Sequence, residues 1–363
     1  MLLSRNVTRK VTFKCHITIC TLDLPKYITE DEFAAIRSQK IPIGNMTLPK
    51  YGEDSVPHAA RPGFGPRLWI NAQVPYTLDP SFSAEQRQKV ALAIQAYHDA
   101  TCIRFIPKQT LIASMIESQV DILHDPNVCG VAHLCMNTGA QFAKFGGSCV
   151  SPGVMIHELG HTLCMGHEQS RRDRDNWISF NTAVCQPHGI DGADFNRGLN
   201  KLYDYVSIEH YEGECYNGCF QPKQPGVTKC GSGGPLSVLD IEILNEMYGC
   251  TQGCLGYRYV NINNNPTYLV QIGEEPYGDI LYSCRAYHQG DIIPGKYHAG
   301  RKECYVAYNG GEHSKTGAHI EVLTSPNGAK LVWVRSNQLP SNAIRGGRTN
   351  ERETIKHFCQ NLL

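Results

Sequence analysis

The sequence predicts an α+β domain followed by a separate all-β module, and three observations predict it. Segments with alternating apolar residues and segments with apolar residues at helical spacing are mixed between residues 68 and 250. One helical segment carries two histidines and a glutamate, and a third histidine follows it, at a spacing suited to a metal ion. After residue 251 only short β-like runs follow, separated by Gly, Asn and Pro, which is typical of an all-β module.

The composition limits the functions that the chain can have. Lys plus Arg and Asp plus Glu both number 34 among 363 residues, so the formal net charge is zero. This balance does not predict binding to nucleic acid or to an anionic membrane surface, and no segment is apolar and long enough to predict a membrane span. The 16 cysteines, without C-x-x-C pairs arranged as a zinc ribbon, favour disulfides and an oxidising compartment.

The N-terminal segment is the least regular part of the sequence. The cysteines predict a secreted, extracellular protein, although the first twenty or so residues lack the apolar core of a clear signal peptide. The loop-rich segment through residue 59 is interpreted either as a propeptide or as a disordered tail. We therefore expect three parts, which span residues 1–59, 60–250 and 251–363.

Periodicity and turn chemistry predict the elements of the middle part. Residues 68–78 alternate apolar and polar side chains and include Pro75, which predicts an edge strand. Ser83 and Gln86 form a capping box that opens a helix over residues 84–101. Strands are further expected at 102–108 and 118–125, a hairpin-like pair within 131–149, and an amphipathic helix within 235–250.

The C-terminal part shows only short strand patterns. They lie at residues 268–272, 279–284, 303–308, 319–323 and 330–334. A weak internal repeat relates Ile280–Cys284 to Ile355–Cys359, each after a glycine-rich turn.

The predicted metal helix carries His157 and His161 four residues apart, which places both imidazoles on one face, about one turn from each other. His167 supplies a third ligand if the chain turns back after Leu163. Three protein ligands leave one position open for water, as a catalytic zinc requires. Glu158 lies too far around the helix to be a ligand but can reach a water at the metal. The alternative, a histidine-rich helix without a metal, fits this order of residues poorly.

The run from His157 to His167 resembles the metzincin zinc signature, and its continuation to Asp175 resembles the astacin family of secreted zinc endopeptidases. Tyr203–Tyr211 resembles the Met-turn segment of that family. The resemblance covers about residues 60–250. It implies a two-lobed catalytic domain with an active-site cleft, one Zn²⁺ per chain, and hydrolysis of peptide bonds in protein or peptide substrates.

The resemblance implies a role for each matched residue. The expected zinc ligands are His157, His161 and His167. Glu158 is the expected general base, which takes a proton from the attacking water and passes it to the leaving amine. Tyr211 is expected to be an additional zinc ligand that swings away and helps to stabilise the oxyanion.

The resemblance also implies that the chain is made as a zymogen. Glu168 is expected to pair with a new α-amino group near Ala60 once the propeptide is cut; its other interpretation is a surface carboxylate. Glu53 or Asp54 is the candidate acid through which the propeptide inhibits. Residues Gly139–Phe145 resemble the edge strand that pairs with extended substrate.

The cysteines include one departure from the family pattern. The implied family disulfides are Cys102–Cys250 and Cys129–Cys149. Cys164, however, stands where the family has the glycine at which the chain reverses, most easily at positive φ. A Cβ in that conformation costs about 1–2 kcal/mol, which a bridge from Cys164 to Cys135 would offset. The other interpretation of Cys164 is a thiolate ligand.

A second departure is Glu209, which replaces the methionine of the Met-turn. That methionine forms an apolar floor under the histidines, and a buried carboxylate there must be paired or protonated. Glu209 either hydrogen-bonds a ligand histidine and tunes the metal or points elsewhere. Together with Cys164 it leaves an alternative function open, a glycan-binding lectin-like protein whose protease lobe is weakened or inactive.

The segment 290–313 and the runs after it resemble the DM-nine, natterin-associated repeat family of lectin-like modules. The resemblance implies an all-β module and, in several members, binding of mannose-type glycans. The binding lysine of that family falls at Lys296, and its acidic partner falls near Glu275 or Asp279. The other interpretation is a structural appendage without a ligand.

Overall fold

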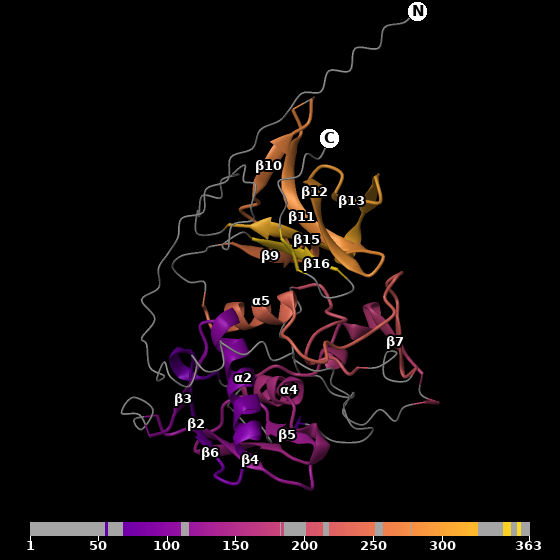
Figure 1. Cartoon of the computed structure of the whole chain (residues 1–363). Coiled ribbons are helices and arrows are strands. Elements are labelled where there is room, and N and C mark those ends of the chain that lie inside the picture. The colour runs from indigo at the N-terminus through magenta and orange to yellow at the C-terminus, as the bar shows by residue number, and fades with distance from the viewer. Residues whose placement is uncertain are drawn as a thin grey trace, which may run out of the picture. The chain divides into compact units, whose positions relative to one another are not determined.

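The computed structural model describes ten segments of the chain. These are residues 55–56, 68–109, 116–181, 183–184, 201–212, 218–250, 257–276, 278–325, 344–349 and 354–356. The chain divides after Thr251 into two compact units, which are described separately (Figure 1). Within the described residues, no helix combines the length and the apolar character that a membrane crossing needs.

The first unit is built on a six-stranded sheet with the strand order β1-β5-β6-β4-β2-β3. The bounds are β1 Ser55–Val56, β2 Gln73–Leu78, β3 Arg104–Pro107, β4 Gln119–His124, β5 Gly130–His133 and β6 Ala140–Phe145. Strands β2, β3, β4 and β6 are parallel, whereas β5 is antiparallel to β6, so the expected hairpin-like pair is present. A two-stranded sheet joins β7 (Ile178–Phe180) and β8 (Phe220–Pro222).

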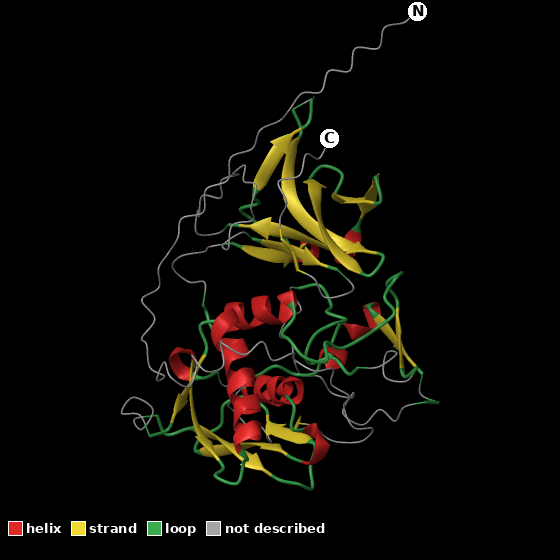
Figure 2. Cartoon of the chain, viewed as in Figure 1, coloured by secondary structure: helices red, strands yellow, loops and turns green. Residues whose placement is uncertain are grey.

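Among the described residues of this unit, three α-helices accompany the sheet (Figure 2). They are α2 (Ala84–Ala100), α4 (Pro152–Thr162) and α5 (Val238–Met247). The capping box predicted for α2 is confirmed, because Ser83 and Gln86 exchange side chain to backbone hydrogen bonds of 2.8 and 3.2 Å. Such a box satisfies two amide groups that the first helical turn leaves without partners.

The prediction that residues 68–78 form an edge strand is wrong, because β2 lies between β3 and β4. Pro75 is nevertheless compatible with this position. The pairing of β2 with β4 covers only Tyr76–Leu78, whereas the pairing with β3 covers Gln73–Tyr76. Pro75 therefore lies where the strand has a registered partner on one side only, and its missing N–H interrupts no ladder on the other side.

Two aromatic side chains anchor the predicted metal helix, α4, in the core of this unit. The Trp69 indole donates to the Thr162 carbonyl at 2.8 Å, and the Tyr97 hydroxyl donates to the Ile156 carbonyl at 2.5 Å. Both aromatic side chains are almost completely buried. Buried donors of this kind need a partner, so these two bonds place α4 against α2 and the segment before β2.

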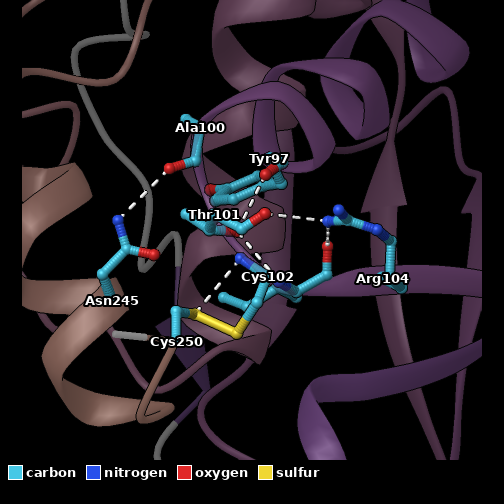
Figure 3. Close-up of a disulfide and its surroundings, with 8 residues drawn as sticks. Tyr97, Ala100, Thr101, Cys102, Arg104, Asn245 and Cys250 are labelled. Carbon is cyan, nitrogen blue, oxygen red and sulfur yellow. Dashed lines mark hydrogen bonds between the residues drawn. A yellow bond between two sulfur atoms is a disulfide. The ribbon is translucent and has the colours of Figure 1, made fainter. Parts of the chain in front are cut away.

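A disulfide between Cys102 and Cys250, one of the two pairs that the family resemblance implies, joins the end of α2 to the end of α5 (Figure 3). Around it, the Cys102 amide donates to the Cys250 sulfur at 3.1 Å and the Asn245 side chain donates to the Ala100 carbonyl at 3.2 Å. The two cysteines are 148 positions apart in the sequence. The bridge therefore ties the C-terminal helix of the unit to its first helix and sheet.

The second unit is a nine-stranded sheet, in agreement with the predicted all-β module. Its main path is β14-β13-β12-β11-β15-β9, with β10 beside β11, β16 beside β12 and β17 beside β16. The bounds are β9 Arg258–Asn261, β10 Gln271–Glu274, β11 Ile280–His288, β12 Asp291–His298, β13 Glu303–Tyr308, β14 Gly311–Lys315, β15 Ile320–Thr324, β16 Arg345–Arg348 and β17 Thr354–Lys356.

The sequence did not predict β12, because Pro294 and Gly295 interrupt its apolar pattern. Gly295 lies between β11 and β13, where a Cβ would overlap the Tyr305 carbonyl oxygen. The Cys284–Cys304 disulfide joins β11 to β13 beside this glycine. The predicted strand at 330–334 lies outside the described residues.

Candidate metal centre and active site

The first two candidate ligands belong to α4, which is buried along its whole length. Ser151 caps the helix by accepting a hydrogen bond from the Val154 amide at 3.3 Å, and Pro152 occupies the first turn, where its missing N–H costs nothing. His157 and His161 follow one turn apart and are both fully buried. Their ring centroids are 4.6 Å apart.

The chain reverses direction directly after α4 at Cys164, whose φ is +74°. Cys164 is bridged to Cys135, the pairing hypothesised from the sequence, and Cys135 also has a positive φ, of +64°. The amides of both cysteines donate to the His161 carbonyl, at 2.9 and 2.8 Å. The disulfide and these two bonds hold a backbone conformation that is unfavourable for residues other than glycine.

This reversal brings His167 back to the two helical histidines. The ring centroid of His167 lies 5.3 Å from that of His157 and 4.7 Å from that of His161. All three side chains are buried, and one ligand atom from each, together with one from Glu209, lies within 4.8 Å of the others. The structure therefore brings together the three imidazoles that the sequence singled out.

The hydrogen bonds of the imidazoles indicate which nitrogen faces the metal. His157 Nδ1 lies 2.8 Å from the Ile208 carbonyl, and His161 Nδ1 lies 2.9 Å from the Met165 carbonyl. A carbonyl only accepts, so each Nδ1 carries the proton and each Nε2 keeps a lone pair. Neutral imidazoles fixed in this tautomer by backbone carbonyls are the ligands that zinc takes in three-histidine sites. The donor set thus fits zinc.

Asp240, which forms the capping box of α5 with the N-cap residue Ser237, holds the backbone that orients His157. Its two carboxylate oxygens accept from the Ser207 hydroxyl at 2.6 Å and from the Ile208 amide at 2.9 Å. Burial, with a contribution from Asp204, raises the pKa of Asp240 to about 6. The helix that the distant disulfide ties down therefore also positions the carbonyl that binds His157.

Glu158 is fully buried beside the ligands, and its carboxylate lies against β5. A Cβ added at Gly130 would come 2.5 Å from Glu158 Oε1 and 2.8 Å from a methyl group of Val154. The glycine at the start of β5 therefore leaves the room that the carboxylate occupies. This role was not predicted from the sequence, although a glycine in a strand is a signal of close approach.

Tyr211 lies against the third histidine, with its ring centroid 4.8 Å from that of His167. Its backbone is held on both sides, because its amide donates to Gln169 Oε1 at 3.1 Å and its carbonyl accepts from His210 Nδ1 at 2.8 Å. The Tyr203 hydroxyl donates to the other ring nitrogen of His210 at 2.8 Å. Burial lowers the pKa of His210 to about 4, which keeps that imidazole neutral.

Glu209 points towards the histidines, which decides between the two orientations that the sequence left open. Its Oε2 lies 3.4 Å from His157 Nδ1 and 3.3 Å from His161 Nδ1. Its other oxygen faces Gly160, where a Cβ would overlap it. Burial raises the pKa of the nearby Tyr97 phenol, and the Glu209 carboxylate adds to that shift.

Glu168 is buried, so its interpretation as a surface carboxylate is wrong. One oxygen accepts from the Arg171 guanidinium at 2.8 Å and from the Asp204 amide at 2.7 Å. Burial raises the pKa of Glu168 to about 7 against the opposing influence of Arg171, whereas Asp173 and Glu168 together outweigh burial and raise the pKa of Arg171. Glu168 and Arg171 therefore form a close ion pair, in which both partners are buried and hydrogen-bonded.

The expectations about the substrate-binding strand and about the propeptide have different outcomes. The expectation that residues Gly139–Phe145 form the edge strand is wrong, since β6 lies between β5 and β4. Strand β5 is the outer antiparallel strand, and it pairs in turn with β1 in parallel register. Ala60, Glu53 and Asp54, the expected residues of maturation and inhibition, lie outside the described residues.

In the second unit, the three candidate glycan-binding residues have different partners. Lys296 Nζ lies 2.7 Å from Glu312 Oε2. Asp279 lies 3.2 Å from His298 Nε2, and Glu275 lies 3.9 Å from the Arg301 guanidinium. The acid that pairs with Lys296 in this structure is thus Glu312, which comes from a neighbouring hairpin and carries no signal in the sequence.

The chain is also similar in sequence to known proteins. The family model described as Astacin, a peptidase family, matches residues 64–249, which is half of the chain. The chain belongs to the astacin family. A second model, described as the DM9 repeat, matches residues 275–359. The family assignment and the three imidazoles with their orienting carbonyls agree on zinc as the metal of this centre.

Several relatives of this astacin chain are zinc metalloproteinases by name. The chain is 31% identical to zinc metalloproteinase nas-7 of Caenorhabditis elegans, and the match covers 51% of this chain and 49% of that protein. It is 34% identical to embryonic protein UVS.2 of Xenopus laevis over 49% and 34% of the two chains. The chain spans about half the length of the curated relatives it matches. The solved structure of high choriolytic enzyme 1, a hatching enzyme zinc-protease from Oryzias latipes, matches with 26% identity and a TM-score of 0.45, over 51% of this chain and 94% of that one.

Proposed function

We propose that the chain is a secreted zinc endopeptidase of the astacin type, made as a zymogen. The convergence of three buried imidazoles, two of them fixed by backbone carbonyls, is the observation that carries the proposal. His157, His161 and His167 would hold the ion. Zinc, when bound, supplies a Lewis acid that polarises the scissile carbonyl and makes water acidic. The three-part organisation, with the protease at 60–250, belongs to the same proposal.

Glu158 is proposed as the general base of the reaction. It follows directly on the ligand His157 in α4 and is buried together with the ligands. Its carboxylate packs against the backbone of β5 at Gly130. From there its carboxylate takes a proton from the attacking water and returns it to the leaving amine, which is the acid–base work that contributes about 10²–10⁴ in rate in other enzymes. Enclosure of the carboxylate keeps bulk water from competing for that proton.

Tyr211 is proposed to stabilise the oxyanion that forms as water attacks. Its phenol lies beside the third ligand, and its backbone is held by Gln169 and His210. Movement of the tyrosine is therefore limited to its side chain, as expected of a group that leaves the ligand position and turns to the substrate. Loss of one such donor typically costs about 10²–10³ in rate.

Two structural features support the zymogen and secretion parts of the proposal. Residues 55–56, within the expected propeptide, form β1 and pair with β5 in parallel at the edge of the sheet. Strand β5 is also the strand whose Gly130 borders the Glu158 carboxylate. A segment in that place blocks the strand edge to which an extended peptide would add. The disulfides of both units favour an oxidising compartment, since such bridges persist there.

A cleavage assay tests this proposal. The chain, after removal of the N-terminal segment, is incubated with a denatured protein substrate, with and without a metal chelator, beside a Glu158→Ala variant. We expect cleavage only by the unchelated wild type, with a loss of at least about 10²-fold in the variant. Equal cleavage in all three samples, or none in any, would contradict the proposal.

The second unit favours a further candidate function, glycan binding through the DM9-type module. Lys296 and Glu312 form an ion pair at the surface of β12 and β14, and the Lys296 ammonium also lies 5.9 Å from the Tyr305 ring. A charged pair beside an aromatic ring is suited to the hydroxyl groups and the apolar face of a sugar. Under this alternative, the module would target the chain to glycans, whatever the strength of the protease.

A further inference from the structure

Glu209 is a carboxylate that the proposed reaction does not use, although it lies against two of the zinc ligands. One oxygen, Oε2, is 3.4 Å from His157 Nδ1 and 3.3 Å from His161 Nδ1. The side chain is only 1% exposed, so water does not screen its effect on the imidazoles. A buried carboxylate is costly unless neighbouring groups interact with its charge, and its position between two imidazoles identifies those groups.

The approach of Glu209 is from outside the coordination sphere. The Nδ1 hydrogens of both histidines point to the carbonyls of Ile208 and Met165, which leaves Nε2 for the metal. Glu209 lies on the Nδ1 side of both rings, whereas the Nε2 atoms would hold the ion. It therefore acts on the imidazoles and not as a fourth ligand.

The surrounding backbone holds Glu209 in this orientation. Its amide donates to the Ser207 hydroxyl at 3.0 Å, and its carbonyl accepts from the Glu168 amide at 3.1 Å. Gly160 supplies the space for its second oxygen, which a Cβ at that position would overlap. With the main chain fixed and the space defined, the carboxylate is preorganised towards the two N–H groups.

We propose that Glu209 is a positioning residue of the zinc centre, a carboxylate shared by His157 and His161 that strengthens zinc binding. This inference rests on the proposed function, because it requires zinc to be held by these histidines. Negative charge beside an Nδ1–H group makes the opposite nitrogen a stronger ligand and holds the ring in its tautomer. The chain thus has an acid where an astacin methionine supplies only an apolar floor.

Zinc affinity of the full chain tests this inference without depending on activity. We would compare wild type, Glu209→Gln, which keeps the volume but removes the charge, and Glu209→Met, which restores the apolar floor. Zinc-free proteins are first compared by thermal unfolding, and zinc is then titrated in competition with a chelator of known affinity. Loss of an outer carboxylate of this kind typically costs about 10–100-fold in metal affinity, and we expect both variants to fall in that range.

The control is Glu242→Gln, at a partly buried carboxylate on α5 that lies 3.7 Å from Lys201 Nζ. The zinc affinity of this variant should equal that of wild type. Zinc affinity of Glu209→Gln or Glu209→Met within twofold of wild type would overturn the inference. A second result would also overturn it. In proteins loaded with cobalt instead of zinc, this would be a metal coordination number in a Glu209 variant that differs from that of wild type, read from the intensity of the d–d absorption bands. If wild type itself took up no stoichiometric zinc, the proposed function would fail as well, whereas equal affinities would remove only the role of Glu209.

Discussion

At the scale of single residues, the centre depends on side chains that replace the usual ones. Cys164 adopts a conformation that costs a non-glycine residue about 1–2 kcal/mol, and its bridge to Cys135 offsets this cost by holding the reversal covalently. Glu209 similarly needs a compensating neighbour, because its second oxygen takes the space where a side chain at position 160 would begin. Substitution and compensation therefore occur as pairs, Cys164 with Cys135 and Glu209 with Gly160.

The second pair predicts non-additive stability. Gly160→Ala should lower the free energy of unfolding by about 1–3 kcal/mol in wild type, the usual cost of overpacking. In a Glu209→Ala background the same change should cost less, because the overlap with Glu209 Oε1 is gone and only the Tyr97 hydroxyl, at 3.0 Å, stays in tight contact, while alanine favours a helix by up to about 1 kcal/mol over glycine. Denaturant unfolding of the four zinc-free proteins measures this coupling; an equal cost in both backgrounds would contradict it.

At the scale of elements, α2 links the sheet to the metal helix through buried polar groups. Near its C-terminal end, His98 Nε2 accepts a hydrogen bond from the Phe105 amide of β3 at 2.9 Å. Burial lowers the pKa of His98 from 6.5 to about 3, and Arg104 adds to the shift. The folded state therefore keeps this imidazole neutral at a pH at which the unfolded chain protonates it.

A histidine whose pKa is depressed by folding stabilises the protein above its unfolded pKa. For His98 this contribution is complete above pH 6.5 and is lost progressively as the pH falls towards 3. Because the imidazole is partly exposed, we expect a loss of roughly 1–3 kcal/mol between pH 7 and pH 4.5, less than the full shift at about 1.4 kcal/mol per pKa unit. His98→Gln should remove most of this acid sensitivity.

Urea unfolding at pH 7 and pH 4.5 measures the effect. His124→Gln, on β4, is the matched control, because its imidazole is also half-buried and belongs to the same sheet. An equal acid-induced loss of stability in His98→Gln and in wild type would show that another group titrates.

At the scale of the whole molecule, the chain combines two compact units that carry separate candidate sites. The candidate metal centre draws on residues from α4 to α5 of the first unit. The candidate glycan site draws on β12 and β14 of the second unit, whose sheet has its own core and its own disulfide. Because each unit has its own core, we expect a substitution in one unit to leave the activity of the other unit unchanged.

This separation is testable with one substitution in each unit. Lys296→Ala should abolish binding of mannose-type glycans on an array and leave peptide cleavage unchanged, because the lysine belongs to the second unit. Lys315→Ala, on β14 of the same sheet, is the matched control and should retain binding. Conversely, metal chelation should stop cleavage without altering glycan binding. Glycan binding that persisted in Lys296→Ala would rule out the assigned lysine.

The local features of this protein were predictable from the sequence. The capping box of α2, the one-turn spacing of His157 and His161, and the reversal after Leu163 depend on residues within a few positions of one another. Their physical causes, backbone hydrogen-bond completion and helix geometry, act over the same short range. The resemblance to a known family added distant pairings such as Cys102–Cys250, which spacing alone cannot predict.

The helices, the metal-binding motif and the change to an all-β module could be predicted from residue patterns. Three features became known only from the folded chain: β2 is an interior strand, β5 lies outside β6 in the antiparallel pair, and Glu209 faces two imidazoles. These outcomes depend on which segments meet after folding, since strand neighbours and buried partners are set by contacts between residues far apart in the chain. Local propensity carries no information about such contacts, and packing of the complete unit selects them.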